Sequence, residues 1–142
     1  METLSQLLAG YAETLRQQLA SRATVSTEGS ELTLVVTAKP HNPRACPFTL
    51  HLESDSELTI TFGSFSICHI DSRDSVTVIL DCRQFVGHFV SGQVTEQVWF
   101  RGGKPCRALA KVGPAGQDVH VHTRSGLCLS PSETDETSFE PY

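Results

Sequence analysis

Two histidines, His120 and His122, come closest to a metal-binding pattern in this sequence. They alternate with Val119 and Val121, and such alternation is typical of a β-strand. Alternate strand residues project from one face, so both imidazoles could reach the same ion. However, no cysteine or carboxylate follows at a spacing that completes a ligand set, and an exposed polar face explains the pair equally well. We therefore predict no metal ion and no other cofactor.

A thiol nucleophile is the second candidate, because Cys68 is followed by His69 and Asp71. Nucleophilic catalysis requires the thiol and its base to converge in space. Cys68 and His69 are neighbours on a predicted strand, where their side chains point to opposite faces. The acidic residues at 53–57 lie between two predicted strands and are typical of a turn. No catalytic constellation is evident, and we predict that the protein is not an enzyme.

The five cysteines are widely separated and include no CxxC pair, which excludes a zinc ribbon and a thioredoxin-like motif. They lie at positions 46, 68, 82, 106 and 128. We expect reduced thiols, mostly buried as small apolar side chains. A reducing compartment fits that expectation.

The acidic residues are concentrated at the C-terminal end. Four of them, Glu133, Asp135, Glu136 and Glu140, lie in the last ten residues, whereas the net charge of the whole chain is −5. The rest of the chain is nearly neutral, which predicts no basic face and no nucleic-acid partner. No apolar run approaches the roughly 18 residues of a membrane-spanning helix, and the stretch METLSQLLAGYAETL lacks the basic start of a signal peptide. We expect a cytoplasmic protein that does not contact a membrane.

Hydrophobic periodicity predicts an N-terminal helix followed by short strands. Leucines and a tyrosine recur on one helical face between Leu4 and Leu19, and Thr3 with Gln6 can form a capping box. After residue 21 the period changes to two, which is typical of a meander with one apolar face. Strands are predicted at 23–27, 32–37, 48–53, 58–62 and 65–70.

A second helix is predicted after this meander. Asp71 or Ser72 can cap its N-terminus, a polar stripe at spacings of three and four follows, and Gly92 is placed to end it. β-Branched residues in the first turn leave a strand over 76–80 as an alternative.

The last third of the chain predicts a hairpin and a polar tail. Strands at 94–100 and 108–112 flank Gly102 and Gly103, which allow the positive φ of a tight turn. A further strand is predicted around 119–121. Ser, Thr, Pro and acidic residues dominate from residue 130 onward, which is typical of disorder.

These elements predict an α+β fold, with an antiparallel sheet of roughly six to eight strands and two helices packed on it. We expect one domain over residues 1–129 and a disordered acidic tail over 130–142. Deletion of residues 131–142 is then expected to leave the melting temperature nearly unchanged.

Trp99, the only tryptophan, is the strongest candidate for a binding residue. Tryptophan and arginine dominate the energetics of protein interfaces, and Trp99 lies on the more polar face of its strand, with Thr95 and Gln97. If that face is exposed, Trp99, Arg101 and Lys104 form one end of a partner-binding patch. If a helix covers the face, Trp99 is a core residue. The sequence leaves both interpretations open.

The stretches ELTITFG (57–63) and FVSGQVTEQVWFRGGKPCRALAK (89–111), with a short strand and a helix between them, carry a family resemblance. The region 57–112 resembles small bacterial immunity proteins of polymorphic toxin systems. In that family a strand ending in Phe-Gly precedes a short strand, a helix and a hairpin with an aromatic residue before a Gly-Gly turn. The resemblance implies a non-enzymatic protein that neutralises a cognate toxin by binding it.

The chain is also similar to type III secretion chaperones, which are small acidic α+β proteins that begin with an amphipathic helix. That resemblance implies a homodimer that binds an effector segment. The C-terminal helix of those chaperones is replaced here by strands and a polar tail. Our prediction is a protein-binding module that neutralises a toxin. The chaperone is the first alternative, and a hydrolase that uses Cys68 or the two histidines His120 and His122 is the second.

Overall fold

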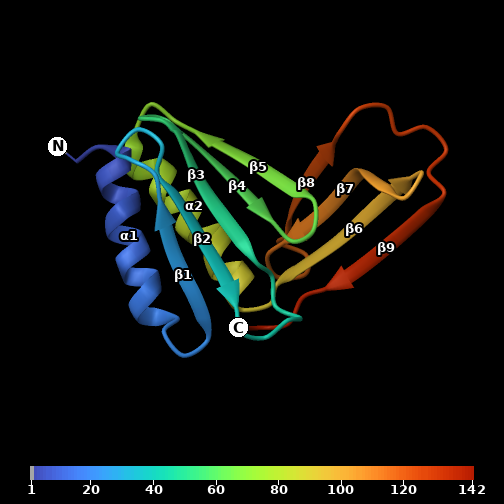
Figure 1. The fold of residues 1–142 in the computed structure, drawn as a ribbon, viewed down its shortest axis with the longest axis horizontal. Helices are drawn as coiled ribbons and strands as arrows, with labels where there is room; N and C mark the ends of the chain where they lie inside the picture. Colours follow the sequence, from blue (N-terminus) through green and yellow to red (C-terminus); the bar gives the residue numbers. More distant parts are fainter. Residues whose placement is uncertain (1) are drawn as a thin grey trace.

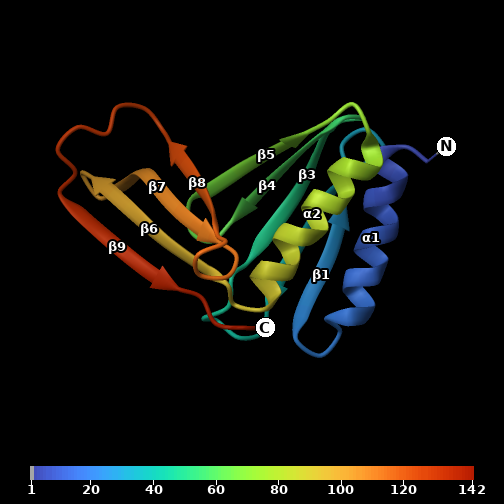
Figure 2. The same cartoon turned by 180° about the vertical axis from the view of Figure 1, so that it is seen from behind.

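The computed structural model describes residues 2–142 and confirms the α+β class, with an N-terminal and an internal helix. Nine strands form two antiparallel sheets, ordered β1-β2-β3-β4-β5 and β8-β7-β6-β9, where a single sheet was predicted. Both helices cover the same face of the five-stranded sheet, and the four-stranded sheet extends away from it (Figures 1 and 2). The elements are α1 (Leu4–Gln18), β1 (Ala23–Glu28), β2 (Val35–Pro40), β3 (Phe48–Ser54), β4 (Glu57–Phe62), β5 (Ser66–Asp71), α2 (Ser75–Val90), β6 (Val94–Arg101), β7 (Lys104–Val112), β8 (Val119–Arg124) and β9 (Glu133–Ser138).

The main core lies between the helices and the five-stranded sheet. Alternate residues of β2, β3 and β4 are buried beneath the helices, and they include Val36, Leu50 and Ile60. The predicted leucine face of α1 is buried against them from Leu4 to Leu15. Burial of apolar surface on this scale is the main source of stability in a domain of this size.

The helix ends follow local sequence signals. The predicted capping box of α1 is confirmed, because Thr3 and Gln6 exchange side-chain and backbone hydrogen bonds. The predicted cap of α2 was wrong, since β5 continues to Asp71 and the side chain of Asp74 accepts the bond from Val76 N–H. Residues 76–80 are helical rather than extended. Gly92 follows the end of α2 with a φ of 75°, a conformation that favours glycine.

Two side chains join the four-stranded sheet to the first sheet. The carboxylate of Glu96 on β6 is buried and accepts hydrogen bonds from the turn between β4 and β5 and from the first residue of β5, namely from Ser64 N, Phe65 N and Ser66 Oγ at 2.8, 3.0 and 2.7 Å. Thr123 Oγ1 on β8 accepts a bond from Ile67 N on β5 at 3.0 Å. These contacts fix the position of β6 and β8 relative to the first sheet.

The segment from residue 130 onward is ordered, so the predicted boundary between a domain at 1–129 and a disordered tail was wrong. Residues 133–138 form β9, which pairs with β6 from Thr95 to Phe100. Every residue of β9 is exposed, so no apolar pattern in the sequence indicated a strand. The backbone ladder to β6 and the residues that follow β9 hold this segment in place.

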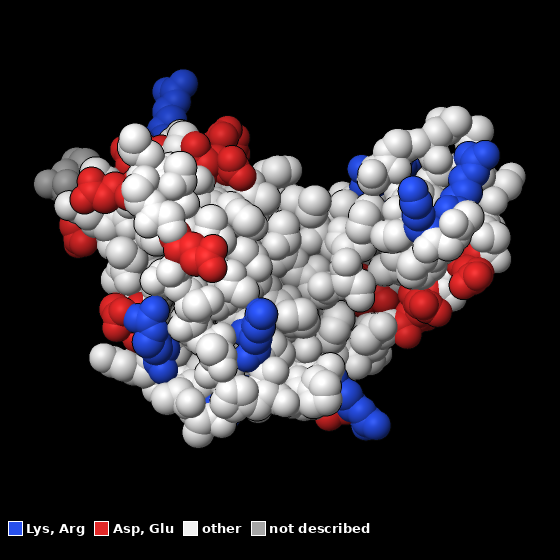
Figure 3. Space-filling view, viewed as in Figure 1, with Lys and Arg blue, Asp and Glu red and all other residues white. Residues whose placement is uncertain are grey.

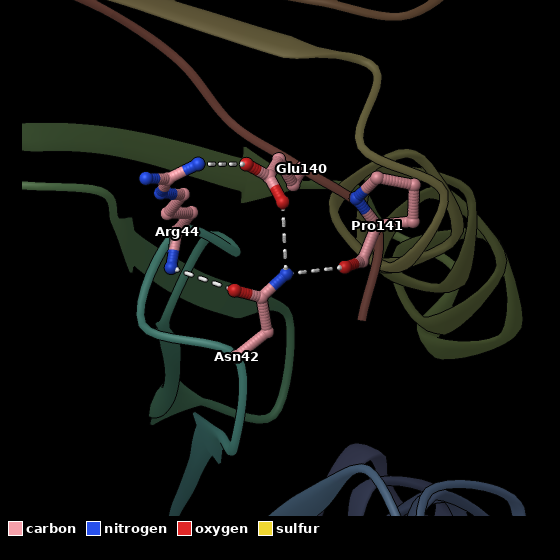
Figure 4. Close-up of polar contacts among 4 residues, drawn as sticks. All are labelled: Asn42, Arg44, Glu140 and Pro141. Atoms are coloured by element: carbon pink, nitrogen blue, oxygen red, sulfur yellow. Dashed lines mark hydrogen bonds and ion pairs between the residues drawn. The ribbon is translucent and has the colours of Figure 1, made fainter.

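The end of the chain packs against the first sheet and α2. Tyr142 N donates to the carbonyl of Val90, and Tyr142 Oη donates to the carbonyl of Cys46. Asn42 and Arg44 both bond to the side chain of Glu140, and Asn42 also donates to the carbonyl of Pro141 (Figure 4). The tail is therefore part of the folded unit.

Cys106 on β7 and Cys128 form a disulfide, with their Cα atoms 5.5 Å apart. The expectation that all five thiols are reduced was wrong for these two. The bond fastens the segment after β8 to β7, so the argument for a reducing compartment no longer stands. Cys46, Cys68 and Cys82 are free, and Cys46 and Cys82 are buried as predicted.

Candidate binding surface

The four-stranded sheet has one buried and one uncovered face. Val94, Val98, Ala108, Ala110 and Val112 are buried on the inner face. The alternate residues of the same strands are half-buried or exposed, so no other element of residues 2–142 covers the outer face. They are Thr95, Gln97 and Trp99 on β6, Arg107, Leu109 and Lys111 on β7, and His120, His122 and Arg124 on β8. We call these nine residues the outer sheet face.

Trp99 lies at one end of the outer sheet face and is half-buried. The pairing of β6, β7 and β8 brings it into one row with Arg107 and Arg124. The guanidinium of Arg107 lies over the indole, with its central carbon 4.0 Å from the ring centroid. Such cation–π stacking holds both side chains in place. A shallow cavity of about 290 Å³ lies beside the pair, and Leu109, His122 and Arg124 also line it.

The outer sheet face is more basic than composition predicts. Arg107, Lys111 and Arg124 all project from it, and two histidines lie beside them. Figure 3 shows basic side chains gathered at the free end of the lobe that this sheet forms, with acidic side chains along its lower margin, where β9 runs. The prediction that no basic face exists was wrong, because composition averages over charges that the pleat separates by face.

The predicted patch residues lie together in the structure. Arg101 is two residues beyond Trp99 on β6, and Lys104 pairs with Arg101 across the hairpin turn. Both charged side chains are exposed, as is the turn between them. Trp99 is neither fully exposed nor covered by a helix.

The structure adds three residues that the sequence analysis missed, namely Arg107, Leu109 and Arg124. The sequence pattern that could have identified them is the alternation of residues along β7 and β8. It assigns each of the three to the face opposite the buried alanines and valines.

His120 and His122 are both exposed on β8 and share the outer sheet face. The Nε2 atom of His120 lies 3.2 Å from the carboxylate of Asp118, a partner that the sequence analysis did not assign. Within residues 2–142 no group of three or more His, Cys, Asp or Glu side chains is arranged to hold a metal ion. Both imidazoles add to the polar character of this face.

Cys68 and His69 point to opposite faces of β5, as the sequence predicts. Cys68 packs against the core, whereas His69 Nδ1 lies 2.9 Å from Thr59 Oγ1. Burial raises the pKa of the Cys68 thiol above its usual value. A raised pKa keeps the thiol protonated at neutral pH, which is the opposite of what an activated nucleophile requires.

We expect native-state alkylation to be slow at all three free cysteines. Burial raises the pKa of Cys46 and of Cys82 to about 12, so almost no thiolate forms at pH 8. The chain is treated with iodoacetamide at pH 8, and the modified cysteines are identified by mass spectrometry. Cys68 should be modified first, and all three free cysteines should be modified only after urea is added. Because each shift is upward, labelling should accelerate as the pH rises. Rapid modification of Cys68 at pH 7 would contradict this prediction and support a thiol enzyme.

Comparisons with protein families, with curated proteins and with solved structures each find no match to this chain. Within residues 2–142, no helix has the length and apolar character needed to cross a membrane.

Proposed function

We propose that this chain is a non-catalytic protein-binding module that uses the outer sheet face to bind its partner. The observation that carries the proposal is Trp99, half-buried under the Arg107 guanidinium on a sheet face that no other element in the described part of the chain covers. Trp and Arg are the residues most enriched among interface hot spots. Because the stacking already orders both side chains, a partner binds them with a smaller loss of conformational entropy.

The charges on this face favour an acidic protein partner. Five basic side chains, Arg101, Lys104, Arg107, Lys111 and Arg124, lie on β6, β7 and β8. Glu136 on β9 pairs with Gln97 and so lies beside the same face. A long polyanion lying across the four strands would meet the Glu136 carboxylate. A discrete acidic surface on a protein can avoid it, and so protein is favoured over nucleic acid.

The resemblance to immunity proteins suggests the identity of the partner. We propose a cognate toxin with an acidic patch, neutralised by direct binding. A secretion effector bound by a chaperone dimer remains the alternative partner. The raised pKa of Cys68 supports binding over thiol catalysis.

Trp99→Ala tests this proposal. Affinity capture from the native host, with mass spectrometry, identifies the partner, and calorimetry then measures its affinity for both forms. We expect Trp99→Ala to weaken binding by at least about 2 kcal/mol, roughly thirtyfold in Kd, as hot-spot truncations do. Leu32→Ala is the matched control, since Leu32 is 83% exposed in the turn between β1 and β2, far in sequence from the outer sheet face.

Two outcomes would count against the proposal. The first is a partner whose affinity is unchanged in a folded Trp99→Ala variant, which would place the interface elsewhere. The second is tight binding of a single-stranded oligonucleotide that Arg107→Ala abolishes, which would assign the outer sheet face to nucleic acid.

A further inference from the structure

The free edge of β5 is only partly paired. Its neighbour on one side is β4, and on the other side it meets β8 of the second sheet at a single place. There Thr123 Oγ1 accepts from Ile67 N at 3.0 Å and lies 3.5 Å from Ile67 O. One side chain therefore satisfies the outward backbone groups of Ile67. The backbone N–H and C=O of Ile67 must point away from β4.

The outward groups of the next residues follow from the alternation of an antiparallel ladder. Because the backbone N–H and C=O of Ile67 point away from β4, those of His69 and Asp71 do too. The bond from Ser72 N to Ser56 O, at 3.2 Å, points toward β4 and fits the same alternation. Within residues 2–142, no backbone partner contacts the outward N–H or C=O of His69 and Asp71. The weak 4.0 Å contact of Cys68 Sγ with His69 O is the one side-chain contact there.

A groove of about 320 Å³ lies along this unpaired edge. Its walls are residues 68–71 of β5, one flank of α2, and the segment that joins β7 to β8. In Figures 1 and 2, β5 and β8 diverge from the place where the two sheets meet. Helix α2 lies on the face of the five-stranded sheet that both helices cover. Cys68, Phe85 and Val112 give the groove an apolar floor, and Val119, which is 54% exposed, lies at its margin.

The two carboxylates that line the groove belong to Asp71 and Asp81. Both residues are exposed, and neither forms an ion pair with a basic side chain of residues 2–142. Among those residues no lysine or arginine lines the groove, and its other polar residues are His69, Gln84, His88 and Gln117. Its charge is thus opposite to that of the outer sheet face. A ligand that carries a basic residue beside an apolar one would complement both features.

We propose that the edge of β5 binds an extended basic-apolar peptide segment of a partner protein as an additional strand. The peptide backbone pairs with the outward groups of His69 and Asp71, an apolar side chain enters the groove over Phe85, and a neighbouring Lys or Arg meets Asp71 or Asp81. Strand addition to an open sheet edge, with a pocket for alternate side chains, is a recurrent mode of peptide recognition. This site lies outside the outer sheet face, and the inference does not rest on the proposed function.

A comparison with two other sheet edges, β9 and β1, shows why β5 is favoured. β9 ends the second sheet with exposed Glu133, Asp135 and Glu136, and charged edges of this kind resist pairing with another strand. On β1, the outward carbonyl of Val25 already accepts a bond from Arg16 Nε on α1. β5 combines unpaired backbone groups with a groove that can take a side chain.

The test uses a phage-displayed library of random dodecapeptides, panned on the intact chain. The enriched peptides should carry alternating apolar residues with an adjacent Lys or Arg. One of them, synthesised with a fluorophore, then serves as the probe. Asp71→Pro should weaken its binding at least about tenfold, because proline removes both the outward N–H and the carboxylate at this position and leaves the inward pairing with β4 in place. Asp81→Lys should weaken it at least about fivefold through charge repulsion.

Matched controls separate these effects from damage to the fold. Thr27→Pro makes the same change on β1, where Thr27 is exposed and its N–H also points outward, since Val25 O accepts from Arg16. Glu53→Lys reverses an exposed charge on β3, outside the groove. Both should leave probe affinity within about twofold. NMR amide exchange should slow at His69 and Asp71 on probe binding, whereas Cys68 and Ile70 already pair with β4.

Three outcomes would overturn the inference. These are a library with no enriched peptide, a probe whose affinity survives Asp71→Pro, and a chain that self-associates through this edge so that Asp71→Pro makes it monomeric. The last would assign the edge to a second copy. Trp99→Ala should leave probe binding intact. Asp71→Pro therefore tests the β5 edge, and Trp99→Ala separately tests the outer sheet face.

Discussion

Deletion of residues 139–142 is expected to lower the free energy of unfolding by at least about 4 kcal/mol. Phe139 and Tyr142 are half-buried against the main core, and the Tyr142 ring centroid lies 6.4 Å from that of Phe48. Truncation of a fully buried aromatic residue costs about 3–5 kcal/mol, so two half-buried rings account for most of the effect. Loss of the hydrogen bonds from Tyr142 to Val90 and Cys46 adds to it.

Urea denaturation followed by far-UV circular dichroism measures this change. The control is a chain with Glu133→Gln and Asp135→Asn, which alters the charge of exposed β9 and should shift stability by less than about 0.5 kcal/mol. Arg44→Ala should fall between the two, since it removes an exposed ion pair to Glu140. An unchanged midpoint for the shortened chain would restore the expectation of a disordered tail and contradict the packing of Tyr142.

Glu96→Ala is expected to destabilise the chain by about 3 kcal/mol or more. Glu96 is only 1% exposed, and its carboxylate is the acceptor for two donors in the turn between β4 and β5 and for Ser66 Oγ at the start of β5. Alanine leaves one buried and two partly buried donors without their partner, and an unsatisfied buried donor costs about 1–3 kcal/mol. The site also fits the carboxylate closely, because a Cβ at Gly63 would lie 2.7 Å from Glu96 Oε1.

Two probes can follow this variant separately. Trp99 is the only tryptophan and lies in the four-stranded sheet, so its fluorescence reports on that sheet. Far-UV circular dichroism reports mainly on the helices over the five-stranded sheet. In Glu96→Ala we expect the fluorescence transition to move to lower urea than the dichroism transition, since the joint between the sheets is lost. Glu53→Ala, at an exposed position, is the control, and equal stability of the two variants would refute the role of Glu96.

Local patterns in the sequence were sufficient for most of the fold. The leucine face of α1, the capping box at Thr3 and the alternation from β1 to β5 each depend on residues a few positions apart. Such signals survive in a single sequence because helix and strand geometry repeat over short distances. The same alternation assigned Cys68 and His69 to opposite faces and excluded their pairing.

The tail, the disulfide and the buried glutamate were not predictable in this way. β9 has no apolar face, and it is a strand because its backbone pairs with β6, which is 32 or more residues away in sequence. Cys106 and Cys128 are paired because the chain after β8 returns to β7. Glu96 stands between valines in a strand, and nothing nearby in the sequence marks it as the acceptor for a distant turn.

The sequence by itself determined the class of the fold, the order of its elements from α1 to β8 and the candidate Trp99, because these depend on periodicity and residue type. Only the tertiary structure decided that the strands divide into two sheets, that basic side chains gather around Trp99, and that the edge of β5 is left unpaired beside an acidic groove. Those properties depend on contacts between residues far apart in the chain. Such contacts are fixed when the surfaces pack, and no local pattern encodes them.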